Sequence, residues 1–302
     1  MKISSIIEKH FWIVLIAGIV FALWIPLPFK VPHFVPKLIL GLMLFLVFLK
    51  IDAIEILENM KNFKLMFYVT SVYMIVIPLF FYFLMKVFDP GLAVGMLLLT
   101  SMPAGVSTPA LTDIVKGNIS LSMSLVITSQ LIAPFTVPLL FWLVVNSSLA
   151  INKLLLLKDI AILVFVPLII SQIIKKYFPR TIKKTQHFFT SANVFLLFSF
   201  VYITMSSQRD VILQNPVGLI WKVAVIYLVF ILLHFIGYFI CYRDKKENRV
   251  AVAIGAAYMN NGMAIVLAVS YFSPEILILM VLSELPWNTL LAPFKKVVEH
   301  LK

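Results

Sequence analysis

Charged residues are scarce in this chain of 302 residues, where Asp, Glu, Lys and Arg together make up only 13%. A soluble domain carries about 25% charged residues. Hydrophobic residues make up 62% of the chain, and the mean hydropathy is +1.05. The composition excludes an ordinary soluble domain and predicts a chain that lies in a lipid bilayer.

Cysteine and the common catalytic motifs are also rare or missing. The single Cys241 excludes a disulfide within the chain and any metal site built from several cysteines. The sequence has no His-Glu-x-x-His motif, no Gly-x-Ser-x-Gly element and no paired intramembrane aspartates. We therefore expect no enzymatic activity and no cofactor, with sodium or a proton considered only as a coupling ion.

Long apolar runs fill most of the chain. Charge clusters and turn residues separate ten of them, and most approach the roughly 20 residues that a spanning helix needs. The runs cover residues 11–27, 35–50, 65–88, 91–115, 120–145, 154–174, 188–206, 217–242, 250–271 and 274–294. We therefore predict an all-α membrane protein with ten spans in one domain over residues 1–302.

Positive charge is plentiful, with a net charge of +12. The basic residues lie in short clusters between the apolar runs, which indicates membrane topology rather than nucleic acid as a partner. Ten spans place both termini on one side, and 18 of the 25 Lys and Arg residues fall on that side. The positive-inside rule therefore predicts a multi-pass protein with cytoplasmic N- and C-termini.

A short internal repeat predicts a duplicated architecture. The sequence Leu-Ile-Ala-Pro-Phe at residues 131–135, in the fifth run, returns as Leu-Leu-Ala-Pro-Phe at residues 290–294, in the tenth. Because five spans separate the copies, the second half must enter the membrane inverted relative to the first. Inverted repeats of this kind are typical of secondary transporters.

The fourth and ninth runs are interrupted at corresponding positions, residues 103–109 and 259–262. Proline removes a backbone donor and glycine unwinds easily, so we predict broken helices at both places. Paired breaks near mid-membrane are typical of transporter binding sites, although kinks with only a packing role are the alternative. The candidate binding residues at these breaks are Pro103, Gly105, Ser107, Thr108, Pro109, Asn260, Asn261 and Gly262.

At these breaks the chain resembles the bile acid:sodium symporter family in its bacterial and archaeal form. The matching segments are residues 101–109, 116–118, 121–122, 131–134, 260–264 and 287–288. The resemblance implies two inverted five-helix repeats, about 1–146 and 150–302, in the plasma membrane of a prokaryote. It also implies a panel of spans 1, 2, 6 and 7 and a core of spans 3, 4, 5, 8, 9 and 10, in which broken spans 4 and 9 cross.

The positions that would hold sodium in this family are poorly matched. Ser122 keeps one ligand, and Thr108 keeps the type of a second. The family's remaining ligand positions, a shared glutamate included, fall on Pro109, Val126, Gly255, Met259 and Tyr73. Sodium prefers oxygen ligands, and these positions offer mainly apolar side chains or glycine. We therefore expect that the two sodium sites of the family are absent.

Glu284, about ten residues into the last run, is the best candidate for an alternative coupling group. Ionisable residues inside a membrane are costly and usually functional. The hypothesis is that Glu284 takes up and releases a proton during transport; a structural hydrogen bond beside Pro286 is the alternative. Asp113 is expected to form an ion pair with Lys116, and His234 to be a hydrogen-bonded helix residue rather than a ligand.

The leading interpretation is a secondary active transporter that works by alternating access. Its substrate would be an amphipathic organic anion, either bile-acid-like or another small carboxylate or sulfate, and its coupling ion need not be sodium. One alternative is an efflux carrier of the auxin-carrier or arsenite-permease type. The other is a membrane sensor or scaffold that does not transport. Substrate identity, transport direction and oligomeric state leave no readable pattern in the sequence.

Overall fold

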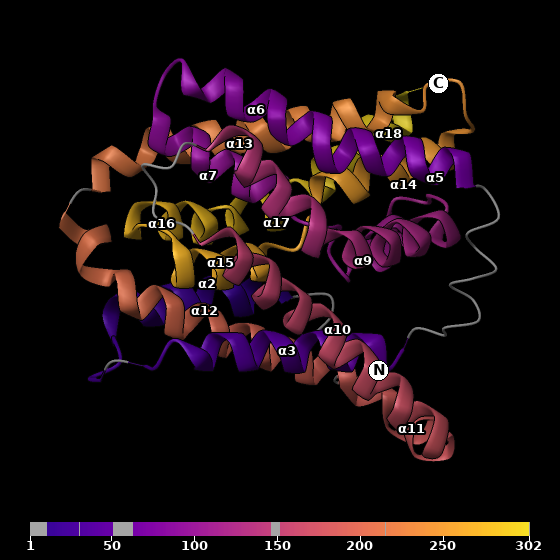
Figure 1. The fold of residues 1–302 in the computed structure, drawn as a ribbon, viewed down its shortest axis with the longest axis horizontal. Helices are drawn as coiled ribbons and strands as arrows, with labels where there is room; N and C mark the ends of the chain where they lie inside the picture. Colours follow the sequence, from indigo (N-terminus) through magenta and orange to yellow (C-terminus); the bar gives the residue numbers. More distant parts are fainter. Residues whose placement is uncertain (1–10, 30, 51–62, 146–151, 215, 302) are drawn as a thin grey trace. The chain divides into compact units, whose positions relative to one another are not determined.

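The computed structural model describes residues 11–29, 31–50, 63–145, 152–214 and 216–301 (Figure 1). Within these residues the chain is all-helical, apart from one isolated antiparallel bridge. The all-α prediction is therefore confirmed for the described part. The chain divides into two compact units. Unit 1 comprises Met1–Ala53 and Ala161–Leu219, and unit 2 comprises Ile54–Ile160 and Ile220–Lys302.

Unit 1 contains helices from the N-terminal part of the described chain and from a central stretch. Its elements are α2 (Phe11–Trp24), α3 (Phe34–Phe48), most of α10 (Lys153–Tyr177), α11 (Pro179–Thr185), the 3-10 turn η2 (Gln186–Phe188) and α12 (Phe189–Gln214). Helix α12 packs against both α2 and α3. Its Tyr202 hydroxyl donates to the Ile25 carbonyl at 2.7 Å, and Arg209 Nε donates to the Leu23 carbonyl at 2.8 Å. These bonds satisfy the carbonyls at the end of α2.

Unit 2 contains most of the remaining helices. They are α5 (Phe63–Ser71), the π-helical turn η1 (Val72–Val76), α6 (Ile77–Lys86), α7 (Pro90–Thr100), α8 (Thr108–Ile114), α9 (Ile119–Val144), most of α13 (Pro216–Ile240), α14 (Lys246–Ala257), α15 (Asn261–Tyr271), α16 (Pro274–Leu282), α17 (Glu284–Thr289) and α18 (Leu291–His300). Helices α7 and α9 begin at well-formed caps. Asp89 accepts from the backbone amides at the start of α7, and Asn118 accepts from Leu121 N at the start of α9.

Several helices are long and apolar enough to cross a membrane. Within the described ranges, five qualify alone: Lys64–Lys86, Ile119–Val144, Leu154–Tyr177, Pro179–Gln214 and Val217–Ile240. A sixth is the bent pair Pro274–Thr289 and Leu291–His300, whose parts meet at 45°. Other apolar runs form shorter helices, because two runs are broken and α3 has only 15 residues. Helix length alone therefore does not confirm the ten-span inverted repeat, which stays a prediction.

A π-helical turn interrupts the span that contains Pro78. The proline ring clashes with the carbonyl four residues earlier, and widening of the preceding turn is one way to accommodate it. The turn η1 covers Val72–Val76 and includes Tyr73, which is 2% exposed. Single π-turns are often found at functional sites, where they redirect a side chain. Here the turn contains buried Tyr73.

Helices α13 and α14 pack unusually closely at Gly237. A Cβ atom placed on Gly237 would lie 2.7 Å from Ala253 Cα and 3.0 Å from Ala256 Cβ. Small residues at such a contact allow two helix backbones to approach, which is a common way of packing helices in membranes. This contact holds α14, the first half of a broken helix, against its neighbour.

Candidate functional site at the crossing of two broken helices

The two breaks predicted from the sequence are confirmed, and they pair with each other. The backbone leaves helical geometry between α7 and α8 and again between α14 and α15. Gly105 N donates to the Tyr258 carbonyl, and Asn260 N donates to the Pro103 carbonyl, each at 2.8 Å. These bonds form the antiparallel bridge between Ala104 and Met259. Each break thus supplies partners for the backbone groups that the other leaves unpaired.

Gly105 is required by the closeness of this crossing. A Cβ atom at this position would lie 2.8 Å from the Tyr258 carbonyl oxygen and 3.2 Å from that of Met259. No described glycine has a positive φ, so backbone freedom is not the reason for glycine here. The sequence argument was that glycine helps to unwind the helix. The structure gives a different cause, which is the direct contact of two backbones.

Side chains from three other helices complete the hydrogen bonding of the crossing. Ala104 N donates to Ser129 Oγ at 3.0 Å, and Gln130 Nε2 donates to the Ala104 carbonyl at 3.3 Å. Tyr73 donates to the Met102 carbonyl at 2.6 Å, and Trp287 Nε1 donates to the Met259 carbonyl at 3.2 Å. These bonds satisfy several polar groups of the irregular backbone internally, as the interior of a bilayer requires.

Ser129 and Gln130 were missed by the sequence argument. Both lie on α9 and are almost fully buried, at 0% and 1% exposure. The available signal was a Ser-Gln pair in the middle of an apolar run, where polar side chains are costly unless they have partners. Tyr73 was considered only as a replaced sodium ligand, whereas its hydroxyl supports the crossing.

The first break ends at Ser107, so two of the candidate binding residues, Thr108 and Pro109, lie just beyond it. Ser107 caps α8 without a side-chain hydrogen bond, and Thr108 and Pro109 form the first turn of α8. Pro103 contributes its carbonyl group to the bridge. Thr108 is fully buried, and its Oγ1 has no partner among the described residues.

The second break ends at Asn260, which caps α15. Its side chain accepts a hydrogen bond from Met263 N at 3.1 Å, and Asn261 and Gly262 begin the helix. Asn260 and Asn261 are 7% and 3% exposed. Within the described residues, Asn260 Nδ2 and both side-chain polar atoms of Asn261 have no hydrogen-bond partner. Buried amide donors without partners at a helix N-terminus favour an anion there.

Glu284 lies next to this N-terminus and is 4% exposed. It begins α17, and Asn288 Nδ2 donates to its backbone carbonyl at 2.6 Å and to its Oε2 at 3.3 Å. The Asn261 amide also faces this carboxyl group but makes no hydrogen bond of standard geometry. The carboxyl group is therefore buried among amide groups, with no cation among its described contacts.

Ser122 and Gly255 are two positions that hold sodium ligands in the family. Ser122, which is expected to keep a ligand, accepts a hydrogen bond at its Oγ from Thr112 Oγ1 at 3.1 Å, and the two residues are fully buried. A Cβ atom at Gly255, the family's glutamate position, would meet only the Leu125 side chain, at 3.4 Å. An apolar neighbour does not suit a hard cation, and the absence of the two sodium sites stays a prediction.

His234 is a hydrogen-bonded helix residue, as predicted. Its Nδ1 lies 2.7 Å from the Phe230 carbonyl and its Nε2 lies 3.2 Å from the Tyr258 hydroxyl. Because a carbonyl can only accept, Nδ1 carries the proton and Nε2 accepts from Tyr258. The Tyr258 ring packs edge-on against Trp287, so this contact links α13 to the crossing. The described residues contain no cluster of three metal-ligating side chains.

The expected ion pair between Asp113 and Lys116 is wrong. Their contact is a backbone bond from Lys116 N to the Asp113 carbonyl at 2.9 Å, and the described residues show no ion pair between them. Lys116 has a φ of 60°, which takes it out of the helix and away from the i,i+3 geometry. The turn is held instead by Asn118, whose Nδ2 donates to Asn248 Oδ1 at 2.7 Å.

These features define a helical membrane protein whose two broken helices are joined at their breaks, an arrangement typical of carriers. Residues 9–288 match the SBF-like CPA transporter family, and the chain belongs to this family. The resemblance to the bile acid:sodium symporter type is confirmed by this match.

One curated relative is the "uncharacterized sodium-dependent transporter YocS" of Bacillus subtilis (strain 168). The chain is 31% identical to it over 189 aligned positions, and the match covers 61% of this chain. The match covers 57% of the relative's length.

Proposed function

We propose that this protein is a secondary transporter that moves an amphipathic organic anion across the membrane by alternating access. The observation that carries the proposal is the crossing at Ala104 and Met259, beside which Asn260 and Asn261 carry buried amide donors without described partners. A carboxylate or sulfate group of the substrate would accept from these donors and benefit from the positive end of the α15 dipole.

The division into two compact units supports a two-part mechanism. Unit 1 contains the apolar runs counted as spans 1, 2 and 7 and most of span 6, whereas unit 2 contains runs 3, 4, 5, 8, 9 and 10. The proposal identifies unit 1 with the panel and unit 2 with the core. Rocking of one unit against the other would then expose the crossing alternately to the two sides.

Coupling is proposed to run through Glu284. The carboxyl group is buried beside Asn261, so its charge state changes the environment of the proposed anion site. A negative Glu284 would repel a bound anion, and a protonated Glu284 would donate a hydrogen bond instead. Proton uptake at Glu284 would therefore favour binding of the anion, which is the linkage that a proton-coupled symporter requires.

Asn261→Leu is the sharpest test of the anion site. The change removes polar atoms that have no described partner, so the folded protein should be as stable as the wild type or more stable. Uptake of taurocholate and of a small carboxylate into proteoliposomes should nevertheless fall by at least tenfold. Asn193→Leu is a matched control, because Asn193 Oδ1 also lacks a described partner but lies on α12 in unit 1. If Asn261→Leu transports normally, the proposed anion site is wrong.

Glu284→Gln tests the coupling separately. The variant should lose stimulation of uptake by an inward proton gradient but keep counterflow of the anion at equal pH. Gradient-driven uptake that survives in this variant would contradict the role of Glu284.

Specific stabilisation of the purified protein by sodium over potassium would show that a sodium site exists despite Gly255 and Met259. Stabilisation by an anion without any flux would favour the sensor alternative.

A further inference from the structure

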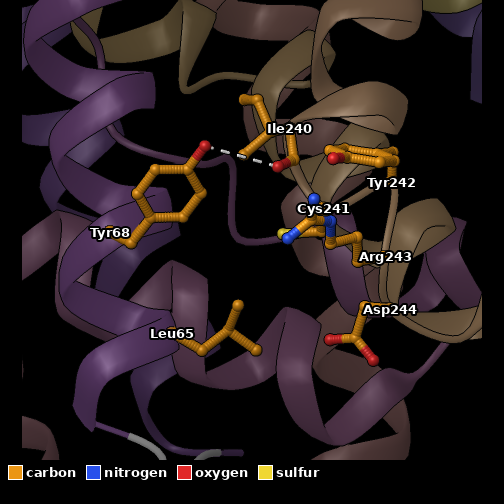
Figure 2. Close-up of a pocket in the computed structure, with 7 residues that line it drawn as sticks. All are labelled: Leu65, Tyr68, Ile240, Cys241, Tyr242, Arg243 and Asp244. Carbon is orange, nitrogen blue, oxygen red and sulfur yellow. Dashed lines mark hydrogen bonds between the residues drawn. The ribbon is translucent and has the colours of Figure 1, made fainter.

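A groove of about 530 Å³ lies at the C-terminal end of α13, and none of the described residues that line it belongs to the crossing. Figure 2 shows Leu65 and Tyr68 of α5 on one side, and the segment from Ile240 to Asp244 on the other. The Tyr68 hydroxyl donates to the Ile240 carbonyl at 3.4 Å across the groove. Both walls belong to unit 2, and the groove opens where the apolar span Val217–Ile240 ends.

The groove is lined by a positive charge that pairs with no described acidic residue. Arg243 is exposed and stacks over the Tyr242 ring at 5.3 Å, and it makes no ion pair with any described residue. Among the described lining residues only Asp244 is acidic, and its Oδ1 already accepts from Lys245 N at 2.7 Å. Lys64 lies one helical turn before Tyr68, so the two share a face of α5. Arg243 thus lines one wall, and Lys64 lies on the same helix face as Tyr68 of the other wall.

Large apolar side chains next in sequence to the groove residues are exposed. Phe67 and Phe239 are 64% and 50% exposed, and Tyr68 and Tyr242 are about half exposed. Tyrosines are enriched at the level of lipid headgroups, and exposed phenylalanines beside them suit acyl chains. The groove therefore combines a cationic rim with an apolar flank. A free anion would use only the rim, whereas a phospholipid would use both.

We propose that this groove binds an anionic phospholipid, with the phosphate between Lys64 and Arg243 and the acyl chains along Phe67 and Phe239. Basic residues next to a span attract anionic headgroups, and the positive-inside rule places this end of α13 on the cytoplasmic side. The bound lipid would bridge α5 to the loop before α14, which leads into the second broken helix. The site is independent of the proposed anion site and does not rest on the transport proposal.

The test uses the full chain, delipidated in a neutral maltoside detergent and titrated with dioleoyl phosphatidylglycerol. Native mass spectrometry would count retained lipid, and the thermal unfolding temperature would follow the same titration. We expect saturable binding of phosphatidylglycerol in preference to phosphatidylcholine. Lys64→Gln and Arg243→Gln should each weaken binding about fivefold, and the double variant more than tenfold.

The matched control is Arg180→Gln with Lys183→Gln on α11 in unit 1, which removes the same charge from another basic loop. This control should retain the affinity of the wild type. An equal loss in the control would show that only overall surface charge matters, which overturns the proposal. Equal stabilisation by phosphatidylcholine, or by soluble glycerol 3-phosphate, would also overturn it. If the double variant does not fold, the single variant Lys64→Gln tests the proposal, because Lys64 is exposed and its replacement should not disturb the fold.

Discussion

Replacement of Gly105 by alanine tests the structural basis of the crossing. The new Cβ atom would lie 2.8 Å from the Tyr258 carbonyl oxygen, which belongs to backbone and cannot rotate away. The strands of the bridge must therefore separate, which stretches the bond from Gly105 N to that same oxygen. Overpacking costs about 1–3 kcal/mol, and a broken buried backbone hydrogen bond costs about 1–3 kcal/mol more.

The expected loss is therefore about 2–6 kcal/mol in the free energy of unfolding, measured by equilibrium unfolding in mixed micelles. Gly255→Ala is the matched control, because its Cβ atom would meet only Leu125 at an ordinary 3.4 Å. Alanine in a helix is favoured over glycine by about 1 kcal/mol, so this control should be neutral or stabilising. If Gly105→Ala is as stable as Gly255→Ala, the close approach of the two backbones is not the reason for glycine.

Three further predictions concern single positions. Ser129→Ala should cost about 1–3 kcal/mol in unfolding free energy, because the buried Ala104 N loses its partner; a cost near zero would show that water replaces the hydroxyl. Lys116→Gly should stabilise by about 1 kcal/mol, because Lys116 has a φ of 60°, and Lys116→Ala, which keeps the strain, should not. Cys241 lies just outside the span Val217–Ile240. Burial, reinforced by the Asp244 carboxylate, raises the pKa of its thiol to about 11. Alkylation of Cys241 at pH 8 should therefore be about 100-fold slower than that of a free thiol and should rise up to pH about 11, whereas a rate equal to that of free cysteine would contradict the burial.

The helical runs and the two breaks could be predicted because their signals are local. Continuous apolar sequence identifies a span, and proline or glycine with polar neighbours marks an interruption. The role of His234 was predictable for a related reason, since no second ligand lies at metal-like spacing. The pair Asp113 and Lys116 shows the limit of this reasoning. Correct spacing did not produce an ion pair, because the backbone turns at Lys116.

Membrane insertion, the positions of the apolar runs and the two interruptions can all be inferred from the amino-acid sequence alone. The partners that satisfy the breaks are visible only in the folded protein. Ser129, Gln130, Tyr73 and Trp287 come from three separate parts of the chain, and hydrogen bonding between such distant parts leaves no periodic pattern. The need for Gly105 likewise arises from a backbone about 150 residues away. Local composition sets the helices, whereas the requirement to pair every buried polar group is met only when the helices pack together.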